Sequence, residues 1–214
     1  MIVTEFCPGG SLWNLIHNPQ KSYPWSSIVD MAKDTAAGLV YLHGHNPPIL
    51  HRDLKSANLL IDKSGGVKVC DFGLARVKES VNTMTGQVGT YQWMAPEVLA
   101  NERYTEKADV YSFGIILWEM ATRQCPYDGM NAIQAAMAVL RESELPLPLS
   151  PYVYLLLFLL LLLLLTRLDP DLRPPVAGAV PAPLNELMVA CWDQSDARRP
   201  TMREALAMLS AMKL

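Results

Sequence analysis

The chain has 214 residues, half of them hydrophobic, which suits one domain with a sizeable core and excludes a wholly disordered chain. The net charge of −3 provides no basic field, so we do not expect nucleic acid as a main partner. The four cysteines include no C-x-x-C pair, and the amino terminus lacks the pattern of a signal peptide. These features favour a cytoplasmic protein with reduced thiols.

The first half of the chain predicts a short strand, a helix and a hairpin. Ile2–Glu5 suits a short strand that ends at the turn Pro8–Gly10. Apolar residues recur at helical spacing through Ser27–Leu42, which predicts an amphipathic helix. Leu59–Ile61 and Val67–Val69 flank a polar, glycine-rich turn and predict a β-hairpin.

The second half is predicted to be mainly helical. Ala108–Met120 is almost entirely apolar, which indicates a helix buried on every side. Thr201–Glu204 has the pattern of a capping box and opens a last amphipathic helix that extends to Met212. The expected fold is therefore mainly α with short β-hairpins, in the α+β class.

One segment differs in composition from the rest. Every residue from Tyr152 to Leu165 is apolar, most of them are leucine, and proline-rich sequence flanks the tract on both sides. The tract is shorter than the roughly 20 residues that a membrane-spanning helix needs. Three alternatives stay open: a short membrane or interfacial segment, a buried helix, or an insertion foreign to the domain. Contact with a membrane is expected only through this tract.

The residues suited to chemistry lie between His51 and Glu97. The segment HRDLKSAN begins at His51, DFG begins at Asp71, and APE ends at Glu97. These motifs match the catalytic loop, the metal-binding motif and the end of the activation segment in the signature set of protein kinases. One triplet alone would carry little information, whereas three in this order and spacing are specific. The chain therefore resembles eukaryotic protein kinases.

The resemblance implies transfer of a phosphoryl group from ATP to a protein substrate, with Mg²⁺ as cofactor. Asp53 would accept the proton of the attacking hydroxyl, and Lys55 would place a positive charge near the transferring phosphoryl group. Asn58, counted with this catalytic set, and Asp71 would supply oxygen ligands to Mg²⁺, which prefers such ligands. Both residues lie at the edges of the predicted hairpin, so one rigid element would position them.

The resemblance also implies an adenine site. The segment 4–7 would be the end of the hinge strand and the hinge, with Thr4 as gatekeeper and with adenine bound through backbone groups, Glu5 and Cys7 included. Leu60 would form the floor beneath the ring. The alternative for this segment is a plain strand and turn.

Regulatory and substrate-facing positions follow from the same resemblance. Arg52 would pair with a phosphorylated activation segment, where Thr83 and Thr85 are favoured slightly over Ser80 as phosphorylation sites. Each of the three could equally be an ordinary polar loop residue. Thr90 would face the substrate.

Two structural contacts are implied as well. Glu97 and Arg199 would form a buried ion pair, which is costly to break because one charge stays buried alone. Asp109 would accept hydrogen bonds from backbone N–H groups of the catalytic loop.

The motifs also indicate a subgroup. Lys55 favours serine/threonine specificity, whereas the segments GTYQWMAPE, DVYSFG, LWE and CW resemble those of tyrosine kinases. This mixture resembles the tyrosine-kinase-like group, with its mixed-lineage and Raf-like kinases, whose members mostly phosphorylate serine or threonine.

The chain also departs from the family pattern. No G-x-G-x-x-G loop or V-A-I-K lysine precedes the hinge, so we expect a carboxy-terminal lobe whose amino-terminal lobe is absent. Family members run from a helix ending near Arg141 into a helix ending at Cys191–Trp192. We therefore divide the chain into hinge (1–10), carboxy-terminal lobe (11–141), a leucine- and proline-rich insert (142–171) and the end of that lobe (172–214).

The sequence supports two functional hypotheses from different classes. The first is a serine/threonine kinase, with impaired activity in the chain as given. The second is a non-catalytic, kinase-like interaction module.

Overall fold

The computed structural model describes residues 3–71, 76–77, 91–130, 132–140 and 180–213. Its α-helices are α1 (Leu12–Ile16), α2 (Trp25–His43), α3 (Pro96–Leu99), α4 (Lys107–Thr122), α5 (Ala132–Leu140), α7 (Ala182–Cys191) and α8 (Met202–Ala211). The 3₁₀ helices within these ranges are η1 (Ser56–Asn58), η3 (Tyr91–Trp93) and η4 (Asp196–Arg198). The strands β1 (Ile49–Leu50), β2 (Leu59–Ile61), β3 (Val67–Val69) and β4 (Arg76–Val77) form two antiparallel pairs, β2 with β3 and β1 with β4.

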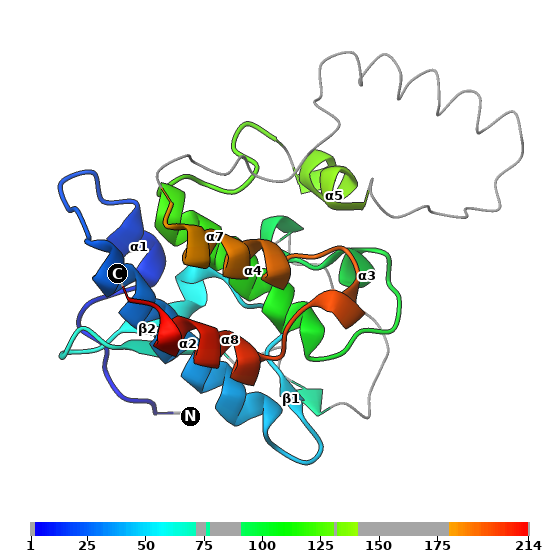
Figure 1. Ribbon diagram of the computed structural model, residues 1–214, viewed down its shortest axis with the longest axis horizontal. Coiled ribbons are helices and arrows are strands. Elements are labelled where there is room, and N and C mark those ends of the chain that lie inside the picture. Colours follow the sequence, from blue (N-terminus) through cyan, green and yellow to red (C-terminus); the bar gives the residue numbers. More distant parts are fainter. Residues whose placement is uncertain (1–2, 72–75, 78–90, 131, 141–179, 214) are drawn as a thin grey trace, which may run out of the picture.

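Helix α4 lies at the centre of the molecule. Its residues from Ala108 to Met120 are all buried, as the continuous apolar run predicts. Helices α2 and α7 both pack against α4, and α8 packs against α2 (Figure 1). A Cβ atom at Gly114 would lie 2.9 Å from the Cβ of Cys191. The close approach of α4 and α7 therefore requires a residue without a side chain at this position.

Several sequence predictions are confirmed. The helix predicted at 27–42 is α2, and the predicted hairpin is β2–β3, with Leu60 opposite Lys68. At the start of α8 the Glu204 backbone N–H donates to Thr201 Oγ1, and the Thr201 backbone N–H donates to Glu204 Oε2 at 2.7 Å. This reciprocal pair is the predicted capping box. Helix α7 ends at Cys191, as the family resemblance implies.

The strand predicted at Ile2–Glu5 is wrong where the structure describes it. Residues 3–7 have no strand conformation, and neither described sheet includes them. An extended segment becomes a strand only when another strand bonds its backbone. The turn after it is confirmed: the Gly10 N–H donates to Cys7 O, and Gly10 has a φ of +73°, which favours glycine.

The leucine tract Tyr152–Leu165 lies outside the described residues, so its three alternatives stay open. Among the helices of the described ranges, none is long and apolar enough to cross a membrane.

One buried carboxylate on α4 holds the segment 51–58. Asp109 is 2% exposed, and its two oxygens accept the backbone N–H groups of His51 at 2.9 Å and Arg52 at 3.0 Å. At the end of α2, His43 Nε2 lies 2.8 Å from Asp109 Oδ2. Burial alone would raise the pKa of Asp109, but the hydrogen bond and charge of His43 and the two backbone N–H groups lower it overall. The expected role of Asp109 is confirmed.

A second buried contact joins α3 to the segment before α8. Arg199 Nη1 donates to Glu97 Oε1 at 2.6 Å, and Nη2 donates to Oε2 at 2.8 Å. The Arg199 side chain is 0% exposed, and its other N–H groups donate to backbone carbonyls. The predicted buried ion pair is confirmed with bidentate geometry.

The substitution Glu97→Gln is expected to lower the free energy of unfolding by about 3 kcal/mol, because it leaves the buried charge of Arg199 without its partner. Urea unfolding at pH 7 measures this change. The neighbouring residue offers a matched control: Arg198 pairs with Asp193 at 2.9 Å, but its side chain is 69% exposed. Arg198→Gln should cost less than about 1 kcal/mol. Similar losses for the two variants would contradict the weight given to burial.

The lowered pKa of Asp109 predicts an acid-sensitive contribution to stability. A carboxylate with a lower pKa in the folded state stabilises the protein above its unfolded-state pKa, near 4, and this contribution is lost as pH falls through the folded-state pKa. The gap in unfolding free energy between the wild type and Asp109→Asn should therefore shrink on acidification below about pH 4. Urea titrations at several pH values measure the gap. A gap that does not change with pH would show that Asp109 is not the group responsible.

Candidate active site

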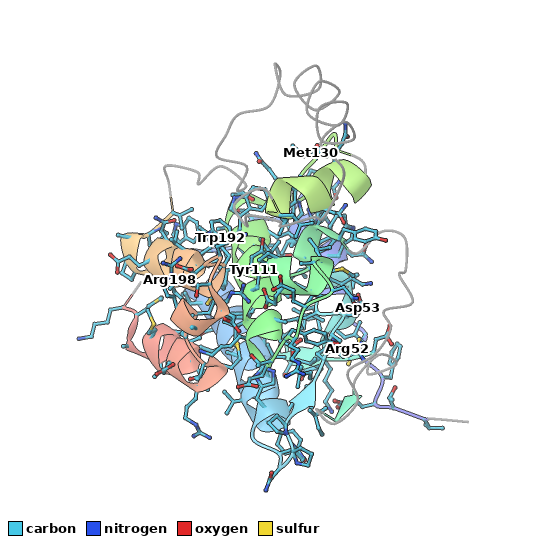
Figure 2. All side chains as sticks on the ribbon, turned by 90° about the vertical axis from the view of Figure 1, so that its right-hand side faces the viewer. Arg52, Asp53, Tyr111, Met130, Trp192 and Arg198 are labelled. Carbon is cyan, nitrogen blue, oxygen red and sulfur yellow. The ribbon has the colours of Figure 1, made fainter. Side chains whose placement is uncertain are left out.

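Asp53 lies at the centre of a polar cluster on the segment between β1 and β2. Asp53 is 5% exposed, and its Oδ2 accepts from Lys55 Nζ at 2.8 Å and from Asn58 Nδ2 at 3.0 Å. Asn58 Nδ2 also donates to the backbone carbonyl of Asp53 at 2.8 Å. The structure thus brings the three predicted catalytic residues together. Figure 2 shows Arg52 and Asp53 beside each other near one edge of the molecule.

His51 connects this segment to the end of the hairpin. Its ring is buried, and Nε2 lies 2.9 Å from the carbonyl oxygen of Cys70, which can only accept. Nε2 therefore carries the proton, and Nδ1 accepts the backbone N–H of Asp53 at 3.3 Å. The imidazole fixes the backbone of Asp53 relative to Cys70.

The hairpin places the two predicted magnesium ligands at the same end. Asn58 immediately precedes β2, Asp71 follows β3, and the Cys70 N–H donates to Asn58 O at 3.0 Å. Both hydrogens of Asn58 Nδ2 are used on Asp53, so the amide oxygen is directed away from Asp53. Asp71 is exposed and has a φ of +62°. An amide oxygen and a carboxylate are ligands that Mg²⁺ prefers, so this donor set fits the cation.

The segment with the expected adenine-site residues is attached to the hairpin. The Gly9 N–H donates to Ile61 O at 3.0 Å, which attaches the segment after Cys7 to β2. Burial raises the pKa of the Cys70 thiol, and the nearby Asp71 and Cys7 raise it further. Cys7 therefore lies close enough to Cys70 to affect the pKa of its thiol.

The other expected adenine-site residues are only partly buried or are exposed. Leu60 is half-buried on β2, whereas Thr4 and Glu5 are exposed. Glu5 forms an exposed ion pair with Lys68 at 3.5 Å, a kind of contact that contributes little to stability. The gatekeeper and hinge roles stay predictions.

Arg52 has a φ of +70°, an uncommon conformation that the hydrogen bond to Asp109 supports. Its guanidinium lies 5.7 Å from the centre of the Tyr104 ring, within range of a cation–π contact. The candidate phosphorylation sites Thr83 and Thr85 and the substrate-facing Thr90 lie outside the described residues. Pairing of Arg52 with a phosphorylated threonine therefore stays a prediction.

Sequence reasoning missed a second buried carboxylate near this cluster. Glu119 on α4 is 0% exposed, and its oxygens accept from Ser56 Oγ at 2.7 Å and from Trp93 Nε1 at 3.2 Å. Burial raises the pKa of Glu119 to about 7, although the two hydrogen bonds act in the opposite direction. The available signal was an acidic residue near the end of an almost entirely apolar helical run.

Comparison with known proteins supports the family indicated by the motifs. The protein kinase domain family matches residues 1–209. "Probable serine/threonine-protein kinase drkB" of Dictyostelium discoideum is 42% identical over 212 residues, which are 99% of this chain and 26% of the relative. "Serine/threonine-protein kinase STY46" of Arabidopsis thaliana is 38% identical over 208 residues, 97% of this chain and 31% of the relative. The chain thus spans about a quarter to a third of the length of these relatives.

The extent of the family match corrects one expectation. The match begins at residue 1, which conflicts with the view that the amino-terminal lobe is absent, and that view is not retained. It rested on motifs that were not found, and a missing motif is weaker support than a match over nearly the whole chain. The boundaries at residues 10, 141 and 171 stay predictions. The motifs around Asp53, their geometry and the match over residues 1–209 agree, and the chain belongs to the protein kinase domain family.

Proposed function

We propose that this chain carries the catalytic machinery of a serine/threonine protein kinase, which transfers the γ-phosphoryl group of ATP to a serine or threonine hydroxyl. The observation that carries the proposal is the cluster at Asp53, where a buried carboxylate has an ammonium and an amide on the same oxygen. The relatives named above are themselves described as serine/threonine-protein kinases. The mixture of motifs supports placement in the tyrosine-kinase-like group, and the cytoplasmic location stays a prediction.

The residues of the cluster would divide the reaction between them. Asp53 would orient the substrate hydroxyl and take its proton while the hydroxyl oxygen bonds to the γ-phosphorus and the bond to the β-phosphate oxygen breaks. The products are a phosphorylated side chain and ADP. Lys55, with Nζ 2.8 Å from Asp53, would place positive charge beside the transferring group. Asn58 and Asp71 would hold Mg²⁺, which when bound neutralises charge on the phosphate oxygens.

The other predicted positions complete the proposal. Thr4, Glu5, Cys7 and Leu60 would contact the adenine end of ATP. Arg52 would pair with a phosphorylated Thr83 or Thr85, and Thr90 would face the protein substrate.

The substitution Asp53→Asn is expected to lower kcat by about 10²- to 10⁴-fold, the usual contribution of a positioned general base. The assay measures transfer of labelled phosphate from Mg²⁺–ATP to a library of serine and threonine peptides. Asp30→Asn is the matched control, because Asp30 is an exposed carboxylate on α2. An Asp53→Asn variant as active as the wild type would overturn the proposal. A wild-type chain without activity would favour the alternative, a non-catalytic interaction module.

Binding of nucleotide can be tested separately from catalysis. At a concentration of Mg²⁺–ATP one hundred times Kd, the wild type should gain about 2.7 kcal/mol in unfolding free energy. Asp71→Asn should lose the part of this gain that depends on Mg²⁺, because it removes one anionic oxygen ligand. Thermal unfolding with ATP alone and with added Mg²⁺ measures both. Equal stabilisation of wild type and Asp71→Asn by Mg²⁺ would exclude Asp71 as a ligand.

A further inference from the structure

The carboxylate of Glu119 joins two segments whose relative position matters for the proposed reaction. Ser56, which donates to Oε1, belongs to η1 and lies between Lys55 and Asn58. Trp93, which donates to Oε2, belongs to η3, close after the predicted substrate-facing Thr90. Because Glu119 is 0% exposed, it cannot touch nucleotide or substrate itself. Any effect on the reaction must pass through Ser56 and Trp93.

We call the contacts of Glu119 with Ser56 and Trp93 the junction. His17, which follows helix α1, contributes a third group to it. His17 Nδ1 lies 3.0 Å from the carbonyl oxygen of Trp13, so Nδ1 carries a proton and donates it. In the neutral ring Nε2 is then an acceptor; it is buried, has no hydrogen-bond partner, and faces Glu119 Oε1 at 3.9 Å. The ring centres of Trp13 and His17 are 3.9 Å apart. The ring centres of Trp13 and Trp93 are 6.1 Å apart, and these two rings meet edge-on. Two facing acceptors favour a proton between them.

The protonation state of Glu119 should therefore change the geometry of the junction. As a carboxylate, Glu119 accepts from Ser56 and Trp93 at the same time. Once protonated, it carries an O–H that can donate to His17 Nε2, which draws Oε1 toward α1 and away from Ser56. Among the residues that the structure describes, Cys125 also responds to Glu119: its thiol pKa is raised by burial and then by the charges of Glu119 and Asp128.

We propose that Glu119 is a positioning residue for phosphoryl transfer: its carboxylate holds the catalytic segment at Ser56 and the substrate-side segment at Trp93 in one arrangement, and a proton taken up by Glu119, which can be donated to the facing Nε2 of His17, changes that arrangement. The inference rests on the proposed kinase function. It also makes a claim that does not need activity, namely that the environment of Trp93 follows the titration of Glu119.

The first experiment reads this link without any catalysis. The full chain is labelled with ¹⁵N-tryptophan, and the indole Nε1–H signals are followed from pH 5.5 to 8.5, with Trp93→Phe to assign the signal of Trp93. The Trp93 signal should titrate in the wild type and stay constant in Glu119→Gln, which keeps the shape of the side chain and removes its charge. A wild-type Trp93 signal that does not move, or one that titrates equally in Glu119→Gln, overturns the proposal.

The second experiment measures kcat and KM over the same pH range. Glu119→Gln should lower kcat at pH 8 by about 10- to 100-fold, since small misplacements of reacting groups carry costs of this size. Its kcat should also lose the pH dependence that the Trp93 signal shows in the wild type. The KM for ATP should stay at the wild-type value. Ser56→Ala should lower kcat in the same direction, because it releases the catalytic segment from Glu119.

Thr35→Val provides the matched control for the loss of a buried hydroxyl. Thr35 donates to the carbonyl oxygen of Met31 at 2.9 Å within α2 and not to Glu119, so this variant should keep the wild-type pH profile of kcat. A Glu119→Gln enzyme with the wild-type kcat and pH profile overturns the positioning role. A wild-type chain that transfers no phosphate overturns the proposed function and the catalytic half of this inference, whereas the indole titration still decides whether Glu119 couples the two segments.

Discussion

The hydrogen bonds from the backbone of His51 and Arg52 to the Asp109 carboxylate are the contact on which the site depends. Asp109 belongs to a helix that is buried over nearly its whole length, so it offers a fixed acceptor inside the core. Arg52 adopts a positive φ, which is costly for a residue with a side chain and persists only where the surroundings enforce it. Asp53 directly follows Arg52 in the chain. The core helix α4 therefore fixes the position of the Asp53 carboxylate through its hydrogen bonds to His51 and Arg52.

Further hydrogen bonds connect this segment to the two ends of the hairpin β2–β3. His51 bonds to Cys70 at the end of the hairpin, and Cys70 bonds to Asn58 at its beginning. Asn58 in turn bonds to Asp53, which closes the network on the residue where it began. Such mutual support holds reacting groups in place before a ligand binds, and positioning supplies much of the catalysis in phosphoryl transfer.

The two buried carboxylates of α4 hold opposite ends of the catalytic segment 51–58. Asp109 holds its beginning and has a lowered pKa, because the contacts with His43 and two backbone N–H groups outweigh burial. Glu119 holds Ser56 near its end and has a pKa raised to about 7, because burial outweighs the hydrogen bonds of a hydroxyl and an indole. One attachment is thus charged throughout the neutral range, while the other changes its charge within it.

The features that depend on neighbouring residues could be predicted from the sequence alone. The period of α2, the hairpin β2–β3, the mostly apolar run of α4 and the capping box of α8 are local patterns, and the structure has each of them. The spacing of the HRDLKSAN and DFG motifs likewise placed Asp53, Asn58 and Asp71 around one hairpin. Two features depend on tertiary contacts: residues 3–5 are not a strand, because no partner strand among the described residues bonds to them, and Glu119 meets partners from other elements. Ser56, Trp93 and His17 are far from Glu119 along the chain, and which donors meet a buried carboxylate is set by how the helices pack.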